Sequence, residues 1–213
     1  MTQRNEQGTS SPISFSEDYQ TLVCRGVPFD TIDVVTPISL FPKQDIERTV
    51  ESMQDLVLDG EDASLYHLEQ IATSYTSKPY SDSKKAFWLT LYADRDDAGR
   101  RLSLDDTVNE RDLDVLRENS KRSQLQIQRL AFLLNERTFV ITRSGYFGLG
   151  QPDARHGDLI CVLHTAGVPF VLRRTSGKEF RFVGDSYVHG IWEGEIFAWV
   201  KDGSKVIEEF CNR

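Results

Sequence analysis

The chain has 213 residues, of which 39% are hydrophobic and 27% are charged, a composition that supports one domain with a sizeable core. The formal net charge of −8 would repel phosphate backbones and argues against a nucleic-acid partner. The sequence has neither a signal peptide nor a run of roughly 18 apolar residues, so we expect a cytoplasmic protein that inserts into no membrane. We predict a single α+β domain over residues 15–213 and a disordered leader over residues 1–14.

Residues 15–137 are predicted to be mainly helical after an initial pair of strands or a strand followed by a loop. Residues 21–35 contain two β-prone runs around Gly26 and Pro28, residues that favour a turn. Apolar residues then recur at helical spacing from Ile46 to Val57. Further helices are predicted over Leu65–Tyr75, over Lys84–Ala93, from Ser103 through Leu116, and around Leu125–Leu134.

Residues 138–213 predict a small antiparallel β-barrel, against which the helical half packs. This part holds ten of the fourteen glycines and carries nine basic and nine acidic residues, so the whole net charge lies in residues 1–137. Short β-prone runs separated by turns are typical of small barrels. The runs are Thr138–Arg143, Asp158–Leu163, Phe170–Arg174, Glu179–Val183, Tyr187–Ile191 and Glu195–Val200. The glycines of 145–150 are predicted to form β-turns, because no Lys-Ser/Thr follows to make a phosphate loop.

Four motifs in the β half occur in a fixed order. They are Gly145-Tyr146-Phe147-Gly148, Gly157-Asp158, Pro169-Phe170-Val171-Leu172-Arg173, and Tyr187-Val188-His189-Gly190 with Gly194-Glu195. Together they resemble the C-terminal region of fungal heterokaryon-incompatibility (HET-domain) proteins. No segment resembles the HET effector domain that usually precedes this region. The resemblance therefore implies either a recognition module or a module put to separate use in fungal secondary metabolism.

The polar groups of the candidate site are Tyr187, His189 and Arg173. Tyr187 and His189 share one face if their segment is extended, because side chains alternate along a strand. A backbone carbonyl could instead satisfy His189 at the strand end. Arg173 could pair with Asp158, Asp185 or Glu195, or it could polarise a substrate carbonyl.

Aromatic residues on both halves could form an apolar wall around these polar groups. The candidates for substrate binding are Trp192, Tyr146 and Phe170 in the β half and Trp88 and Phe87 in the helical half. The three cysteines form no CxxC pair, and neither an HExxH motif nor a Gly-x-Ser-x-Gly elbow is present. We therefore expect a site that uses no cofactor and no metal.

Two hypotheses of function remain open at this stage. The first is a cofactor-independent cyclase or isomerase, such as a pericyclase of Diels–Alderase type. Its substrate would be an apolar terpenoid or polyketide intermediate, positioned by the aromatic wall and activated by hydrogen-bond donors. The alternative is a HET-type self/non-self recognition or protein-interaction module without catalysis, which predicts an exposed apolar or charged patch. Both hypotheses leave a homodimer open.

Overall fold

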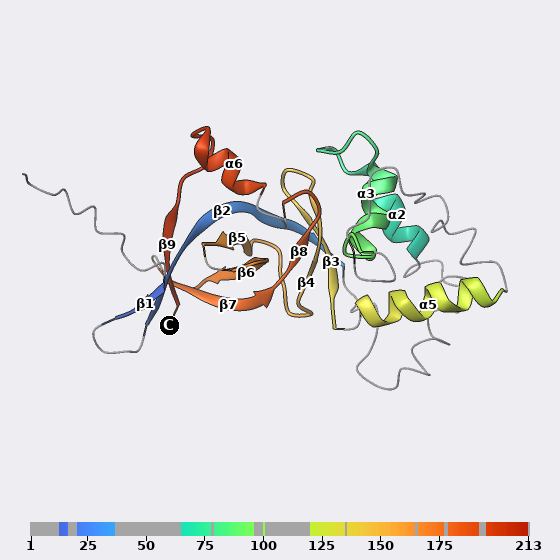
Figure 1. The fold of residues 1–213 in the computed structure, drawn as a ribbon, viewed down its shortest axis with the longest axis horizontal. Helices are drawn as coiled ribbons and strands as arrows, with labels where there is room; N and C mark the ends of the chain where they lie inside the picture. Colours follow the sequence, from blue (N-terminus) through green and yellow to red (C-terminus); the bar gives the residue numbers. More distant parts are fainter. Residues whose placement is uncertain are drawn as a thin grey trace, which may run out of the picture.

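The computed structural model places strands on one side of the molecule and most of the helices on the other (Figure 1). It describes residues 13–16, 21–36, 65–77, 79–95, 100, 120–134, 136–164, 166–176, 179–191 and 195–212. The helices predicted from Ile46 to Val57 and from Ser103 through Leu116 lie outside these residues, as does Trp192.

Three predicted helices are confirmed as α2 (Leu65–Ser74), α3 (Ser83–Leu91) and α5 (Lys121–Leu134). Asp82 begins α3, because its Oδ1 accepts a hydrogen bond from the Lys85 amide at 2.9 Å. The three helices bury apolar residues against one another and against strand residues such as Phe139. Within the described residues, none of the helices combines the length and apolar character needed to cross a membrane.

The segment predicted as a pair of strands or a strand plus a loop forms one long strand, β2 (Leu22–Val35). Gly26 and Pro28 do not make a turn. Instead, the register between β2 and its neighbour β5 (Leu159–Leu163) shifts between Pro28 and Asp30, and this irregularity accommodates the proline. A Cβ on Gly26 would lie 2.7 Å from the Val162 carbonyl oxygen, so glycine permits the two strands to approach closely.

A ring of strands closes through β2 and β5. The order is β5, β6 (Pro169–Arg174), β7 (Glu179–Asp185), β9 (Glu208–Asn212) and β2, and β2 pairs again with β5. The prediction of a wholly antiparallel barrel formed within residues 138–213 is therefore wrong in two respects. The ring takes β2 from outside that range, and β7 pairs with β9 in parallel. Closure pairs the strand edges that an open sheet would leave exposed.

A second group of strands extends from β2 toward the helices (Figure 1). It consists of β3 (Thr138–Thr142), β4 (Phe147–Gly150) and β8 (Tyr187–Val188). The prediction of a turn cluster at 145–150 is wrong for β4, where Gly148 lets the backbones approach: its Cβ would lie 2.6 Å from the Tyr187 carbonyl oxygen. The tyrosine strand predicted to reach Ile191 is shorter, since Gly190 turns the chain with a φ of 91°.

Two further elements differ from the sequence predictions. The run Glu195–Val200, predicted as a strand, contains the helix α6 (Ile196–Lys201). Trp199 of α6 stacks on Phe29 at 5.9 Å between ring centroids, a tertiary contact that the short apolar run does not reveal. The strand β1 (Ile13–Phe15) pairs with the start of β2 and overlaps the predicted leader.

Each strand of the ring contributes a buried side chain to one cluster. The cluster contains Cys24, Cys161, Leu163, Leu172, Phe180 and Phe210. A second cluster joins the other faces of β2 and β5 to Val140 and Val188. A third joins the helices to β3, β4 and Tyr187, so Tyr187 lies at the junction between the helices and the strands.

Candidate functional site

The structure places the predicted Tyr187–His189 pair on one face of the chain. The Tyr187 hydroxyl lies 2.9 Å from His189 Nδ1, so the two side chains lie together as expected, although the strand β8 ends at Val188 and His189 already lies in the turn. Tyr187 is buried in the core, and the His189 amide donates to the Phe147 carbonyl at 2.9 Å. Backbone pairing and the tyrosine hydroxyl together fix the orientation of the imidazole.

Tyr80, just before α3, is a member of this site that the sequence analysis missed. Its hydroxyl accepts a hydrogen bond from the Phe147 amide and donates one to the His189 carbonyl, both at 3.0 Å. The Tyr80 ring lies 5.3 Å from the imidazole. Burial raises the pKa of Tyr80, so its hydroxyl stays protonated at neutral pH. Because Tyr80 follows Pro79 in a loop, the local pattern gives no sign of this contact.

Replacing Tyr80 by phenylalanine is expected to lower the free energy of unfolding by about 1–3 kcal/mol. The change removes one hydroxyl and leaves the Phe147 amide and the His189 carbonyl without this partner in a half-buried setting. Urea unfolding at pH 7 measures the difference. Tyr75→Phe is the matched control, because the Tyr75 hydroxyl donates at 2.7 Å to Asp33, whose side chain is one-third exposed and open to water. An equal effect of the two substitutions would contradict the bridging role.

The aromatic residues predicted to bind a substrate are divided among different parts of the core. Phe87 and Trp88 are buried in the same cluster as Tyr187, and Trp88 Nε1 donates to the buried Glu69 at 3.0 Å. Tyr146 lies beside Tyr80, with 5.8 Å between ring centroids. Phe170 instead packs on the ring cluster, 5.9 Å from Phe182. Three of the predicted rings therefore lie on the side of the core that holds the Tyr187–His189 pair: Phe87 and Trp88 share the cluster of Tyr187, and Tyr146 contacts Tyr80.

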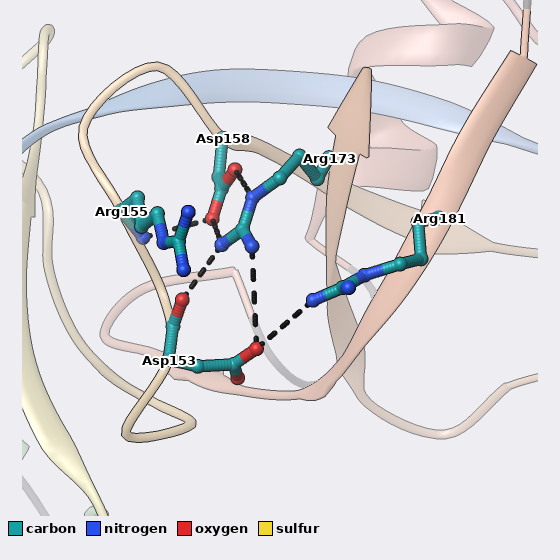
Figure 2. A network of polar contacts seen from close by, with 5 residues as sticks. All are labelled: Asp153, Arg155, Asp158, Arg173 and Arg181. Atoms are coloured by element: carbon teal, nitrogen blue, oxygen red, sulfur yellow. Dashed lines mark hydrogen bonds and ion pairs between the residues drawn. The ribbon is translucent and has the colours of Figure 1, made fainter. Parts of the chain in front are cut away.

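Arg173 forms the centre of an ionic network in the ring, shown in Figure 2. Its guanidinium donates to both carboxylate oxygens of Asp158, at 2.8 and 2.7 Å, and to the Asp153 carbonyl at 2.6 Å. Hydrogen bonding to Asp158 raises the pKa of Arg173. Arg181 extends the network to the Asp153 carboxylate at 3.1 Å. Of the partners proposed for Arg173, the structure selects Asp158.

The same network explains the Gly157-Asp158 step of the sequence motif. The Asp158 carboxylate accepts a hydrogen bond from the Arg155 amide at 2.8 Å, while its own amide donates to the Arg155 carbonyl. Asp158 is 3% exposed, so it stabilises the turn and pairs with Arg173 from inside the fold. Asp185, another proposed partner, instead pairs with Arg137 at 2.7 Å. Arg173 is thus bound to Asp158 and Asp153, whereas Tyr187 and His189 bind each other. The structure does not bring the three predicted polar groups together in one hydrogen-bond network.

The chemistry of thiols and metals adds little to the site. Burial raises the pKa of Cys24 and of Cys161, which keeps both side chains protonated and poorly nucleophilic. In the part of the chain that the structure describes, no three His, Cys, Asp or Glu side chains gather in a way that could hold a metal ion.

Comparison with known proteins identifies the family. Residues 89–202 match the model of the Het-6 beta-barrel domain, and this segment is more than half of the chain. The chain belongs to the Het-6 beta-barrel domain family. The resemblance seen in the sequence motifs is therefore confirmed, and the matched residues run from α3 to just beyond α6. The strands β2 and β9, which complete the ring, lie outside the match.

A curated relative supports the same assignment over a shorter length. The chain is 34% identical over 59 residues to "Heterokaryon incompatibility protein 6, OR allele" of Neurospora crassa, which covers 26% of this chain and 9% of that protein. The chain thus spans only a small part of the relative's length. No solved structure gives a significant match to the chain.

Proposed function

We propose that this chain is a recognition module of the heterokaryon-incompatibility type, which acts by binding another protein. The observation that carries the proposal is membership of the Het-6 beta-barrel domain family over residues 89–202. The named relative, a heterokaryon incompatibility protein, adds support. We also infer that the closed ring of strands is the small β-barrel to which the family name refers.

The contacts of the candidate catalytic groups favour recognition over cyclisation. Arg173 is held by two carboxylate oxygens and a carbonyl, and removing it from Asp158 to reach a substrate would leave a buried charge unpaired. The buried Tyr187 directs its hydroxyl to the partly buried His189. These contacts give the polar groups structural roles, and neither comparison supports a cyclase or a Diels–Alderase. The structure exposes several large apolar side chains, among them Phe15 and Phe132, and the proposal is that a partner protein covers some of them.

The proposal is tested by introducing the coding sequence into Neurospora crassa strains of different incompatibility genotype. The readout is the number of viable transformants or of surviving fused hyphae. If the chain is a recognition module, this number falls at least about tenfold in some genotypes and does not fall in the others. A uniform result across genotypes, at equal levels of the soluble protein, would refute the proposal. If a folded His189→Ala variant and a folded Tyr187→Phe variant both lose the effect, the result supports the enzymatic alternative instead.

A further inference from the structure

The strand β9 has one edge that the ring covers only in part. On one side β9 pairs with β2 along its whole length, Glu208–Asn212. On the other side only two of its residues, Cys211 and Asn212, pair with β7. Figure 1 shows β9 at the left margin of the ring, on the side away from the helices α2, α3 and α5. Before the short contact with β7, the edge of β9 is therefore open.

The backbone of residues 206–210 forms the open part of this edge. Successive residues of a strand direct their N–H and C=O groups to opposite sides, so only about half of these groups can reach β2. Among the residues that the structure describes, no second strand pairs with the groups on the other side. The four side chains from Val206 to Glu209 are all exposed. Unpaired backbone groups along an exposed strand edge are a template for another strand.

The side chains on this edge are two apolar residues followed by two acidic residues. Val206 and Ile207 are 63% and 38% exposed. Glu208 makes no ion pair with any described residue. The side chain of Glu209 is 65% exposed, and its carboxylate lies 3.9 Å from the Arg25 guanidinium. The open edge therefore combines an apolar pair with exposed negative charge.

We propose that the edge formed by residues 206–209 binds an extended segment of a partner protein, which adds to β9 as an antiparallel strand and carries two basic residues followed by two apolar residues. An antiparallel partner runs in the opposite direction, so its basic pair lies opposite Glu209 and Glu208 and its apolar pair opposite Ile207 and Val206. Backbone hydrogen bonds supply the affinity, and the side-chain pairs supply the specificity. This inference rests on the proposed recognition function and names the surface that performs it.

The acidic pair argues against two other occupants of the edge. If two copies paired their 206–209 segments antiparallel and in register, each glutamate would lie opposite a glutamate or an apolar side chain, and neither pair is favourable. Lys205, the nearest cation in the sequence, already donates to the Phe29 carbonyl at 2.7 Å. An anionic lipid surface would repel Glu208 and Glu209. Charge on an open edge thus prevents self-association and favours a partner of opposite charge.

The experiment uses a fluorescein-labelled synthetic peptide of about ten residues, the length of a long strand. Its centre has two arginines followed by two valines, with threonines and serines on both sides. A second peptide carries glutamates in place of the arginines. Two further arginine peptides carry N-methyl groups on alternate residues, one on the odd set and one on the even set, so that each has one blocked backbone edge.

Fluorescence anisotropy measures binding of each peptide to the full chain and to three variants, whose folding is first compared by circular dichroism. Glu208→Lys reverses the free charge of the edge, and Val206→Ser removes an exposed apolar side chain. Leu125→Ser is the matched control, because Leu125 is 66% exposed but lies in α5.

The arginine peptide is expected to bind the wild-type chain, and the glutamate peptide is not. Glu208→Lys is expected to weaken binding of the arginine peptide about fivefold or more and to permit binding of the glutamate peptide. Val206→Ser is expected to weaken binding of the arginine peptide, and Leu125→Ser to leave it unchanged. One N-methylated peptide should lose binding and the other should keep it, because strand addition uses only one edge of the peptide.

Three results would overturn the proposal. The first is that the arginine peptide fails to bind at about 1 mM. The second is that Glu208→Lys binds this peptide as well as the wild type does. The third is that the two N-methylated peptides bind equally, which would indicate attraction between charges without strand pairing.

Two further measurements distinguish the other occupants. Sedimentation that shows a dimer lost in Val206→Ser would assign the edge to a second copy and overturn the proposal. Binding to vesicles of phosphatidylcholine and phosphatidylserine that is lost in Val206→Ser would assign it to lipid, with the same consequence. If peptide binding fails while the genotype-dependent effect in fungal strains persists, the recognition function stands and only the surface is wrong. If the peptide binds as expected while that effect is uniform across genotypes, the binding edge stands and the recognition function fails.

Discussion

Replacing Arg173 by methionine is expected to lower the free energy of unfolding by about 3–5 kcal/mol, because it leaves Asp158 as an unpaired charge inside the fold. Asp158 is 3% exposed and receives two hydrogen bonds from the guanidinium. Methionine keeps much of the side-chain length and removes every donor. Urea unfolding at pH 7 measures the loss.

Arg181→Met is the matched control for this prediction. Arg181 contacts the same network through Asp153, but both side chains are about half exposed, so the pair contributes only about 0–1 kcal/mol. Replacing Asp158 by asparagine in the Arg173→Met background removes the buried charge and is expected to recover part of the stability. Equal unfolding midpoints for Arg173→Met and Arg181→Met would show that the carboxylate of Asp158 is not held by Arg173.

Replacing Gly145 by alanine is expected to lower the free energy of unfolding by about 2–5 kcal/mol. Gly145 has a φ of 86° in the turn between β3 and β4, a conformation that costs an L-residue about 1–2 kcal/mol. An added Cβ would also lie 2.0 Å from the Ser77 carbonyl oxygen, so the backbone must move, at a further cost of about 1–3 kcal/mol. Since Ser77 precedes Tyr80 closely, this movement would also strain the bridge to His189.

Gly157→Ala separates the two contributions to this loss. Gly157 has a φ of 88°, and no atom lies within 4 Å of the position of an added Cβ. Only the conformational cost of about 1–2 kcal/mol is therefore expected there. Both variants are compared by urea unfolding in the same buffer. If Gly157→Ala costs as much as Gly145→Ala, the close approach of Ser77 to the turn is not a constraint in solution.

Periodic segments with long patterns were predictable from the sequence. The helices α2, α3 and α5 follow from apolar residues three and four apart, since each pattern extends over several turns. The strands β5, β6 and β7 follow from short β-prone runs between glycine-containing turns. The shared face of Tyr187 and His189 follows from alternation within two residues. Each of these features depends on residues that are close together in the sequence, so the local pattern is enough to predict it.

Features that depend on a distant partner were not predictable. The sequence pattern predicts a turn at Gly148. In the structure Gly148 belongs to β4, because β3 and β8 pair with it on either side at close range. The run from Ile196 to Lys201 is apolar enough for a strand, but it forms a helix whose Trp199 stacks on Phe29. In both cases a contact far along the chain outweighs a weak local preference.

The family resemblance, the division into a helical and a β half, and the kinds of side chain at the candidate site all follow from the sequence. The order of its motifs is a property of the chain alone, and the match to the Het-6 beta-barrel domain agrees with it. Three features became visible only in the folded chain: β2 and β9 close the ring, Asp158 pairs with Arg173, and Tyr80 bridges to His189. These contacts join residues 15 to more than 180 positions apart, and no local pattern encodes such a pairing. The choice of the buried face of α5 has the same origin, because Ile127 and Leu130 are buried by the elements that pack against the helix.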